Sequence, residues 1–180
     1  FERVGDLFGV ASTLNNLADL HRRAGHLAEA EAHYRRALGI SQSQGAAQLE
    51  ATIVGGLCLV LIREARYDEA LRELEVAWRM ADVLGQVGAL AALHALSLPC
   101  AVVAKDRASW AEHEGRLSAR VNDEAVLDRA VIEAVELAGD LSQQAGDLER
   151  ARRAWTLAAR LFANAGLRDK AGALRAKATD

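Results

Sequence analysis

The feature that most constrains this chain is a helix–turn–helix pattern that recurs about every 40 residues. In the stretch Leu14–Leu38, apolar residues at helical spacing flank Gly25, and a glycine there can end a helix in the left-handed conformation. The second helix of each unit shares a set of three positions, from which the third unit departs most. In chain order these are Ala30, Tyr34 and Ala37; Ala70, Leu74 and Ala77; Trp110, Glu114 and Leu117; and Ala151, Trp155 and Ala158. Such a period indicates an array of repeats, each packed against its neighbours.

Glycines after the periodic segments and aspartates before them place the helix boundaries. We expect helices at residues 6–24, 27–44, 46–64, 67–84, 86–104, 107–121, 123–145 and 147–165. They form four pairs, about 6–44, 46–84, 86–121 and 123–165, and an amphipathic segment at 167–178 follows as a C-terminal cap. We expect residues 1–180 to form one superhelix. Because the chain opens at Phe1 rather than at Met, we also expect it to be part of a longer protein.

Composition favours an all-α fold. The chain is 51% apolar but only 4% aromatic and contains a single proline, so its core must consist mainly of Ala, Leu and Val in closely packed helices. That proline, Pro99, lies inside an expected helix, where it removes a backbone hydrogen bond. We expect either a kink or break near Ala95–Leu98 or a shorter helix followed by a loop.

The charge balance and the cysteines argue against several classes of function. A net charge of −3 provides no basic surface for nucleic acid or for a membrane. The apolar run Gly88–Ala104 is shorter than the ~20 residues of a membrane span and is interpreted as a buried helix. Cys58 and Cys100 lie in apolar helical runs, so we expect free thiols and a cytoplasmic protein. Heavy use of arginine over lysine suggests a bacterial source.

The sequence contains no recognisable catalytic or metal-binding constellation. The carboxylates Glu133, Glu136 and Asp140 share one helix face, but without a histidine at ligand spacing they fit a solvated face better than a metal site. The five histidines show no zinc-ligand spacing, and no nucleophile has a base and an orienting group beside it. We therefore expect no enzyme activity, no metal and no cofactor.

The residues that carry the repeat pattern resemble a known family. Leu14, Leu17, Ala18, Gly25, Ala30, Tyr34 and Ala37 are similar to the signature of the tetratricopeptide repeat. The segments LNNLA and EAEAHYRRAL and the period near 40 residues resemble those of the kinesin light chain and Pins-type adaptor subgroup. A looser resemblance, in GDLFGVASTLNNLADLHRRAG, is to the repeat-rich C-terminal regions of bacterial Ser/Thr kinases with an ATPase module and of multidomain transcription regulators. The family implies a right-handed α-solenoid of about four helix pairs.

The resemblance also implies where a partner binds. In this family the first helix of each pair lines a concave groove that holds an extended peptide or a partner helix. The matching residues are Asn15, Asn16, Asp19, Arg22 and Arg23 in the first pair, Leu59, Ile62 and Arg63 in the second, Val102 and Val103 in the third, and Glu133, Glu136 and Asp140 in the fourth. The groove is polar and basic, then apolar, then acidic, which favours a ligand with an apolar middle and oppositely charged flanks.

Two functions are consistent with these expectations. The first is a non-enzymatic interaction module, a scaffold or adaptor, that binds a protein or peptide in the groove. The alternative is a regulatory or sensor segment of a bacterial kinase or transcription regulator. The uncovered apolar residues Val4, Leu7, Phe8 and Val10 also offer a face through which two copies of the chain can pair.

Overall fold

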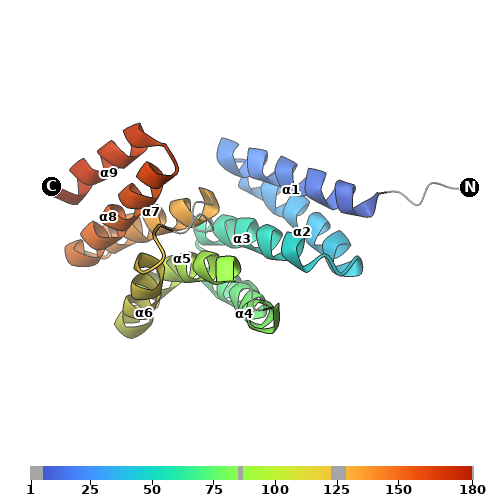
Figure 1. Cartoon of the computed structure of the whole chain (residues 1–180), viewed down its shortest axis with the longest axis horizontal. Helices are drawn as coiled ribbons and strands as arrows, with labels where there is room; N and C mark the ends of the chain where they lie inside the picture. The colour runs from blue at the N-terminus through green and yellow to red at the C-terminus, as the bar shows by residue number, and fades with distance from the viewer. Residues whose placement is uncertain (1–5, 85–86, 123–128, 180) are drawn as a thin grey trace, which may run out of the picture. The chain divides into compact units, whose positions relative to one another are not determined.

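The computed structural model describes residues 6–84, 87–122 and 129–179, and within these ranges it contains α-helices and turns but no β-strand (Figure 1). The helices are α1 (Leu7–Ala24), α2 (Leu27–Ser43), α3 (Ala47–Arg63), α4 (Tyr67–Leu84), α5 (Val87–Val103), α6 (Arg107–Ser118), α7 (Arg129–Gln144), α8 (Leu148–Asn164) and α9 (Arg168–Thr179). The all-α fold expected from the composition is therefore confirmed.

Most helix boundaries lie within one residue of the expected ones, because local capping signals determine them. The aspartates that precede α1, α6 and α8 each accept hydrogen bonds of 2.8–3.1 Å from backbone N–H groups of the first turn; they are Asp6, Asp106 and Asp147. One helix differs, since α6 ends at Ser118 rather than near residue 121. The expected start of the seventh helix, at 123–128, lies outside the described residues.

Helix α5 continues through Pro99, so the expected break, and the alternative of a shorter helix with a loop, are both wrong, whereas the expected kink stays a prediction. Pro99 cannot donate a hydrogen bond to the carbonyl of Ala95. The side chains around it, Leu96, Leu98 and Cys100, are nevertheless all buried. Burial of an almost wholly apolar helix therefore outweighs the loss of one backbone hydrogen bond.

The described helices group into two compact units, Phe1–Met80 and Ala81–Asp180, with the boundary inside α4. In the first unit α1 packs on α2 and α2 packs on α3. Small residues allow the close approach of α1 and α2: Ala11, Ala18, Ala30 and Ala37 are all buried. A glycine does the same for α2 and α3, because a Cβ at Gly56 would lie 2.4 Å from Cζ of Tyr34.

In the second unit α5 packs on α6 and α7, α7 on α8, and α8 on α9. The ring of Trp155 lies so close to Gly139 of α7 that a Cβ there would be 2.4 Å from its Cδ1. Helix α9 buries Ala171 and Leu174, while its basic side chains, such as Arg175, are exposed. The single superhelix expected over residues 1–180 stays a prediction.

Candidate partner-binding surface

The predicted groove residues Asp19 and Arg22 form a polar contact inside the first unit. Tyr34 Oη donates to Asp19 Oδ1 (2.6 Å), and Arg22 Nη2 donates to the same oxygen (3.0 Å). Arg22 is only 2% exposed, whereas the Asp19 side chain is 46% exposed. Burial, reinforced by the neighbouring Asp19 carboxylate, raises the pKa of Tyr34 far above its ordinary value. Arg22 therefore serves the fold, and only the outer edge of Asp19 faces solvent.

Asp140 holds an equivalent contact in the second unit. Trp155 Nε1 donates to Asp140 Oδ1 (2.9 Å), and 15 residues separate the two, as they separate Asp19 and Tyr34. The third partner here is Lys177 of α9, whose Nζ bonds Asp140 Oδ1 (2.5 Å) and lies 4.4 Å from the centre of the Trp155 ring. Cation–π attraction and the ion pair together hold α9 against α7 and α8. The shared 15-residue offset is a sequence signal that the groove prediction did not use.

Six predicted groove residues are buried and do not present their side chains to solvent. They are Asn15, Arg22, Leu59, Ile62, Val102 and Glu133. The apolar middle of the groove therefore is not an accessible surface at Leu59, Ile62 and Val102. The physical reason is that the C-terminal halves of α3 and α5 are buried on all sides, at Gly56–Ile62 and Ala95–Val102. Helical register alone does not distinguish a ligand-facing apolar stripe from a second buried one.

The exposed candidates in the first unit lie on α1 and α3. Asn16 and Arg23 of α1 and Arg63 of α3 are exposed. Arg63 Nη1 donates to the backbone carbonyl of Arg22 (3.5 Å), so the C-terminal ends of the two helices are adjacent. The structure thus brings an amide, two cations and the outer edge of Asp19 onto neighbouring first helices.

The predicted acidic face of α7 is largely neutralised by nearby cations. Glu133 is buried and accepts from Arg129 Nε (2.9 Å), while Asp140 pairs with Lys177. Glu136 lies between them and is half-buried, and burial raises its pKa above the ordinary value. Within the described part of this unit, the face presents less negative charge than its sequence suggests.

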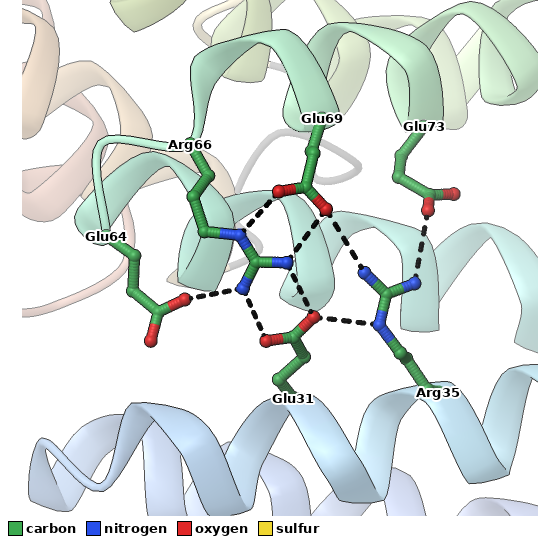
Figure 2. A network of polar contacts seen from close by, with 6 residues as sticks. All are labelled: Glu31, Arg35, Glu64, Arg66, Glu69 and Glu73. Atoms are coloured by element: carbon green, nitrogen blue, oxygen red, sulfur yellow. Dashed lines mark hydrogen bonds and ion pairs between the residues drawn. The ribbon is translucent and has the colours of Figure 1, made fainter.

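A network of charged residues on the second helices joins α2 to the α3–α4 turn and α4 (Figure 2). Arg66 contacts Glu31 (2.6 Å), Glu64 (2.8 Å) and Glu69 (2.7 Å), and it lowers the pKa of both Glu31 and Glu69. Arg35 bonds Glu31 (2.8 Å) and approaches Glu69 and Glu73. Sequence reasoning missed this network, although Glu31 and Arg35 have the i, i+4 spacing of a helix ion pair. It links successive repeats on the side of the second helices and is not part of the candidate surface.

Two histidines of the second unit also meet, with His94 Nδ1 2.9 Å from His113 Nδ1. Burial lowers the pKa of His94 to about 4 and also lowers that of His113. At neutral pH the pair is therefore uncharged, with one Nδ1 as donor and the other as acceptor. No sequence signal connects these residues, which belong to different helices.

Over the described ranges the structure shows neither a metal-binding cluster nor a membrane-spanning helix. No group of three or more His, Cys, Asp or Glu side chains there is arranged to hold a metal ion. None of the described helices combines the length and the apolarity needed to cross a membrane. Cys58 and Cys100 are buried and form no disulfide, as expected, and burial raises the pKa of Cys100 to about 11.

The first helix pair matches a known family. Residues 10–43 match the family described as tetratricopeptide repeat. The chain has no match among curated proteins. Among solved structures, BtubC (BKLC) from P. vanneervenii is similar, with a TM-score of 0.60 and 18% sequence identity over 96% of this chain and 80% of that chain. At this identity the likeness shows a shared fold. The chain therefore has an all-α helical-repeat fold, and its residues 10–43 match the tetratricopeptide repeat family.

Proposed function

We propose that this chain is a protein-interaction module and that the first-helix surface of its first unit binds an extended acidic segment of a partner. Tetratricopeptide repeats generally mediate protein–protein interactions and typically are not enzymes. The observation that carries the proposal is the position of two exposed cations, Arg23 and Arg63, at adjoining ends of α1 and α3.

The local charge balance favours an acidic ligand. Asp19 is the nearest carboxylate on α1, and it already accepts hydrogen bonds from Arg22 and Tyr34. Arg23 and Arg63 are both exposed beside this carboxylate, so cationic groups reach solvent here. Charge complementarity of this kind raises the association rate and selects the sign of the partner's charge.

Backbone recognition is the second element of the proposal. Asn16 is exposed on α1, and its amide can both donate to and accept from the backbone of an extended peptide. Because Leu59 and Ile62 are buried, the peptide gains affinity from polar contacts more than from an apolar groove floor. For Val103, Glu136 and Asp140, in the second unit, contact with a partner stays a prediction from the sequence.

The test begins with selection of peptides from a random display library on the whole chain, followed by fluorescence polarisation of the selected peptides. We expect these peptides to be rich in Asp and Glu. Arg23→Glu should raise the dissociation constant about 10-fold, or ~1.4 kcal/mol, and higher salt should weaken binding to the unmodified chain.

Arg36→Glu is the matched control, because Arg36 is exposed on α2, away from this surface. It should leave the dissociation constant unchanged. Selected peptides without acidic residues, or equal effects of the two charge reversals, would contradict the proposed surface.

A further inference from the structure

Exposed apolar side chains concentrate on one helix, α1. Leu7, Phe8, Val10, Leu17 and Leu20 are each 37–60% exposed. Among the described residues, the other large exposed apolar side chains are scattered over α4, α5, α8 and the turn before α9. A contiguous apolar face on a protein surface indicates an interaction site more strongly than scattered residues do.

The spacing on α1 is that of a helix-pairing seam. Leu7, Val10, Leu14 and Leu17 follow one another at intervals of three, four and three residues, which is the a/d spacing of a coiled coil. Thr13 and Leu20 flank this seam on its exposed side, and neither carries a charge. We call residues 7, 10, 13, 14, 17 and 20 the α1 seam.

In the second repeat the corresponding face is covered. The positions on α3 that correspond to Leu14, Leu17 and Leu20 are Val54, Leu57 and Val60, and all three are buried. Helix α2 packs against α3, and Gln42 Nε2 donates to Glu50 Oε1 (3.2 Å) at this contact. Glu50 is the residue of α3 that corresponds to Val10 of α1. On α1 the same face is open to solvent.

We propose that the α1 seam pairs in antiparallel orientation with the α1 seam of a second copy of this chain. The two ends of the helix are complementary in charge, because Asp6 caps the N-terminus and the last turn carries His21 and Arg23. Antiparallel pairing places Asp6 of one copy beside the basic last turn of the other and aligns the two helix dipoles favourably. The two-fold axis then passes near Leu14, where the seam faces itself.

Head-to-tail stacking of copies is disfavoured by the chemistry of the last helix. Helix α9 exposes Arg168, Lys170 and Arg175, and its apolar residues Ala171 and Leu174 are already buried. It offers no apolar face to receive the α1 seam. An isologous contact instead closes after two copies.

Pairing through the seam leaves the proposed peptide surface free. On α1, Asn16 lies about 100° around the helix from Leu17 but only about 40° from Leu20, so Asn16 borders the seam, whereas Arg63 of α3 lies outside it. The pair presents two peptide surfaces, and a partner with two acidic segments gains from the raised effective concentration.

Sedimentation velocity of the whole chain, from about 1 μM to about 500 μM, tests the pairing. We expect a shift from monomer to dimer across this range. The double variant Leu17→Lys/Leu20→Lys should raise the dimer dissociation constant about 100-fold or more, since it places two charges within the seam. Leu148→Lys on α8 is the control and should leave the dimer unchanged. Circular dichroism checks that each variant stays helical.

Cysteine cross-linking tests the orientation. Thr13→Cys lies near the two-fold axis and should form a covalent dimer on mild oxidation. Leu7→Cys should not, because antiparallel pairing separates the two copies of residue 7 by about 20 Å along the helix axis. The native Cys58 and Cys100 are buried, so they do not compete.

The outcomes separate this proposal from the peptide-binding one. A monomer at the highest concentration, or a dimer that Leu148→Lys disrupts as strongly as the seam variant does, overturns the pairing. Equal cross-linking at positions 7 and 13 overturns the antiparallel arrangement. The seam variant should retain binding of the selected acidic peptides, and Arg63→Glu, on α3 and outside the seam, should weaken that binding but retain dimerisation.

Discussion

The α1–α2 and α7–α8 pairs hold the same carboxylate–aromatic contact but complete it with different cations. Asp19 and Tyr34 are joined by Arg22, which comes from the same helix as the carboxylate and is buried. Asp140 and Trp155 are joined by Lys177, which comes from α9 and is 40% exposed. A buried cation depends on its carboxylate far more than an exposed one, because water replaces the partner only at the surface.

The packing of the two aromatic rings differs as well. Tyr34 lies against Gly56 of α3, so it ties the first pair to the next helix. Trp155 lies against Gly139 of α7, so it closes the fourth pair on itself. The aromatic residue at this position therefore contacts the following helix pair in the first repeat and its own helix pair in the fourth.

The second and third pairs lack both the carboxylate and the aromatic ring of this contact. At the positions of Asp19 and Tyr34 they carry Leu59 and Leu74, and then Pro99 and Glu114. Their turns also differ: Gly25 and Gly146 adopt positive φ in the first and fourth pairs, whereas in the second and third pairs Ala65 (φ 58°) and Lys105 (φ 56°) do so. The two middle pairs therefore contain local strain that the first and fourth avoid.

The largest effect expected from this comparison is that of removing the two carboxylates. Asp19→Ala should lower the free energy of unfolding by about 3 kcal/mol, because the buried Arg22 loses a charged acceptor. Asp140→Ala should cost only about 1 kcal/mol, since Lys177 can be hydrated. Urea denaturation followed by circular dichroism measures both. Equal losses would show that burial of Arg22 does not make the first contact more important.

The next largest effect is expected when the glycines that contact the rings of Tyr34 and Trp155 are substituted. Gly56→Ala and Gly139→Ala should each cost about 2 kcal/mol, because a methyl group at either position overlaps an aromatic ring. Tyr34→Leu should recover part of the loss at Gly56 but none of the loss at Gly139. A double-mutant cycle measures this coupling, and strictly additive losses would contradict the role of Tyr34 between α2 and α3.

Mild acid should affect the second unit through its histidine pair. The folded-state pKa of His94 is about 4, below its unfolded value near 6.5, so the unfolded chain binds more protons between these values. Stability is therefore full above about pH 6.5 and falls as the pH drops toward 4, by about 1 kcal/mol after allowance for partial solvent access. Glu112 and Asp106 oppose this effect around the pair, whereas Arg116 and Arg120 reinforce it.

Urea denaturation at pH 7.5 and pH 5 of the unmodified chain and of His94→Gln measures the histidine contribution. The variant should lose less stability than the unmodified chain between the two pH values. The same loss in both would exclude His94 as its source. The carboxylates Glu31 and Glu69 of the first unit, whose pKa values are lowered, lose their contribution only below about pH 4.5.

The smallest effect is expected at the turns. Ala65→Gly and Lys105→Gly should each raise the free energy of unfolding by about 0.5–1 kcal/mol, because glycine adopts positive φ without a steric cost. Gly25→Ala and Gly146→Ala should lower it by a similar amount. Thermal and urea denaturation of the four variants compares the two kinds of turn, and a loss of stability at Ala65→Gly would show that its φ is not strained.

Helix positions were largely predictable, because they depend on short-range signals. Aspartates, glycines and apolar periodicity act within a few residues of each helix end, and the observed boundaries follow them. The exception, Pro99, shows the limit of local reasoning, since burial of α5 overrides the missing hydrogen bond. The candidate surface was less predictable. The family resemblance placed Asn16, Arg23 and Arg63 among the groove residues, and they are exposed, but it placed Leu59 and Ile62 there too, and they are buried.

The sequence by itself determined an all-α repeat protein, because the period and the capping residues act locally and recur along the chain. Only the tertiary structure decided which charged side chains of the candidate surface remain exposed to a partner. Arg22 and Asp140 look like free groove residues in the sequence, yet their partners Tyr34, Trp155 and Lys177 come from other helices. The reason is physical: helical periodicity fixes the face on which a side chain lies, whereas its burial and its partner depend on what another helix brings against that face.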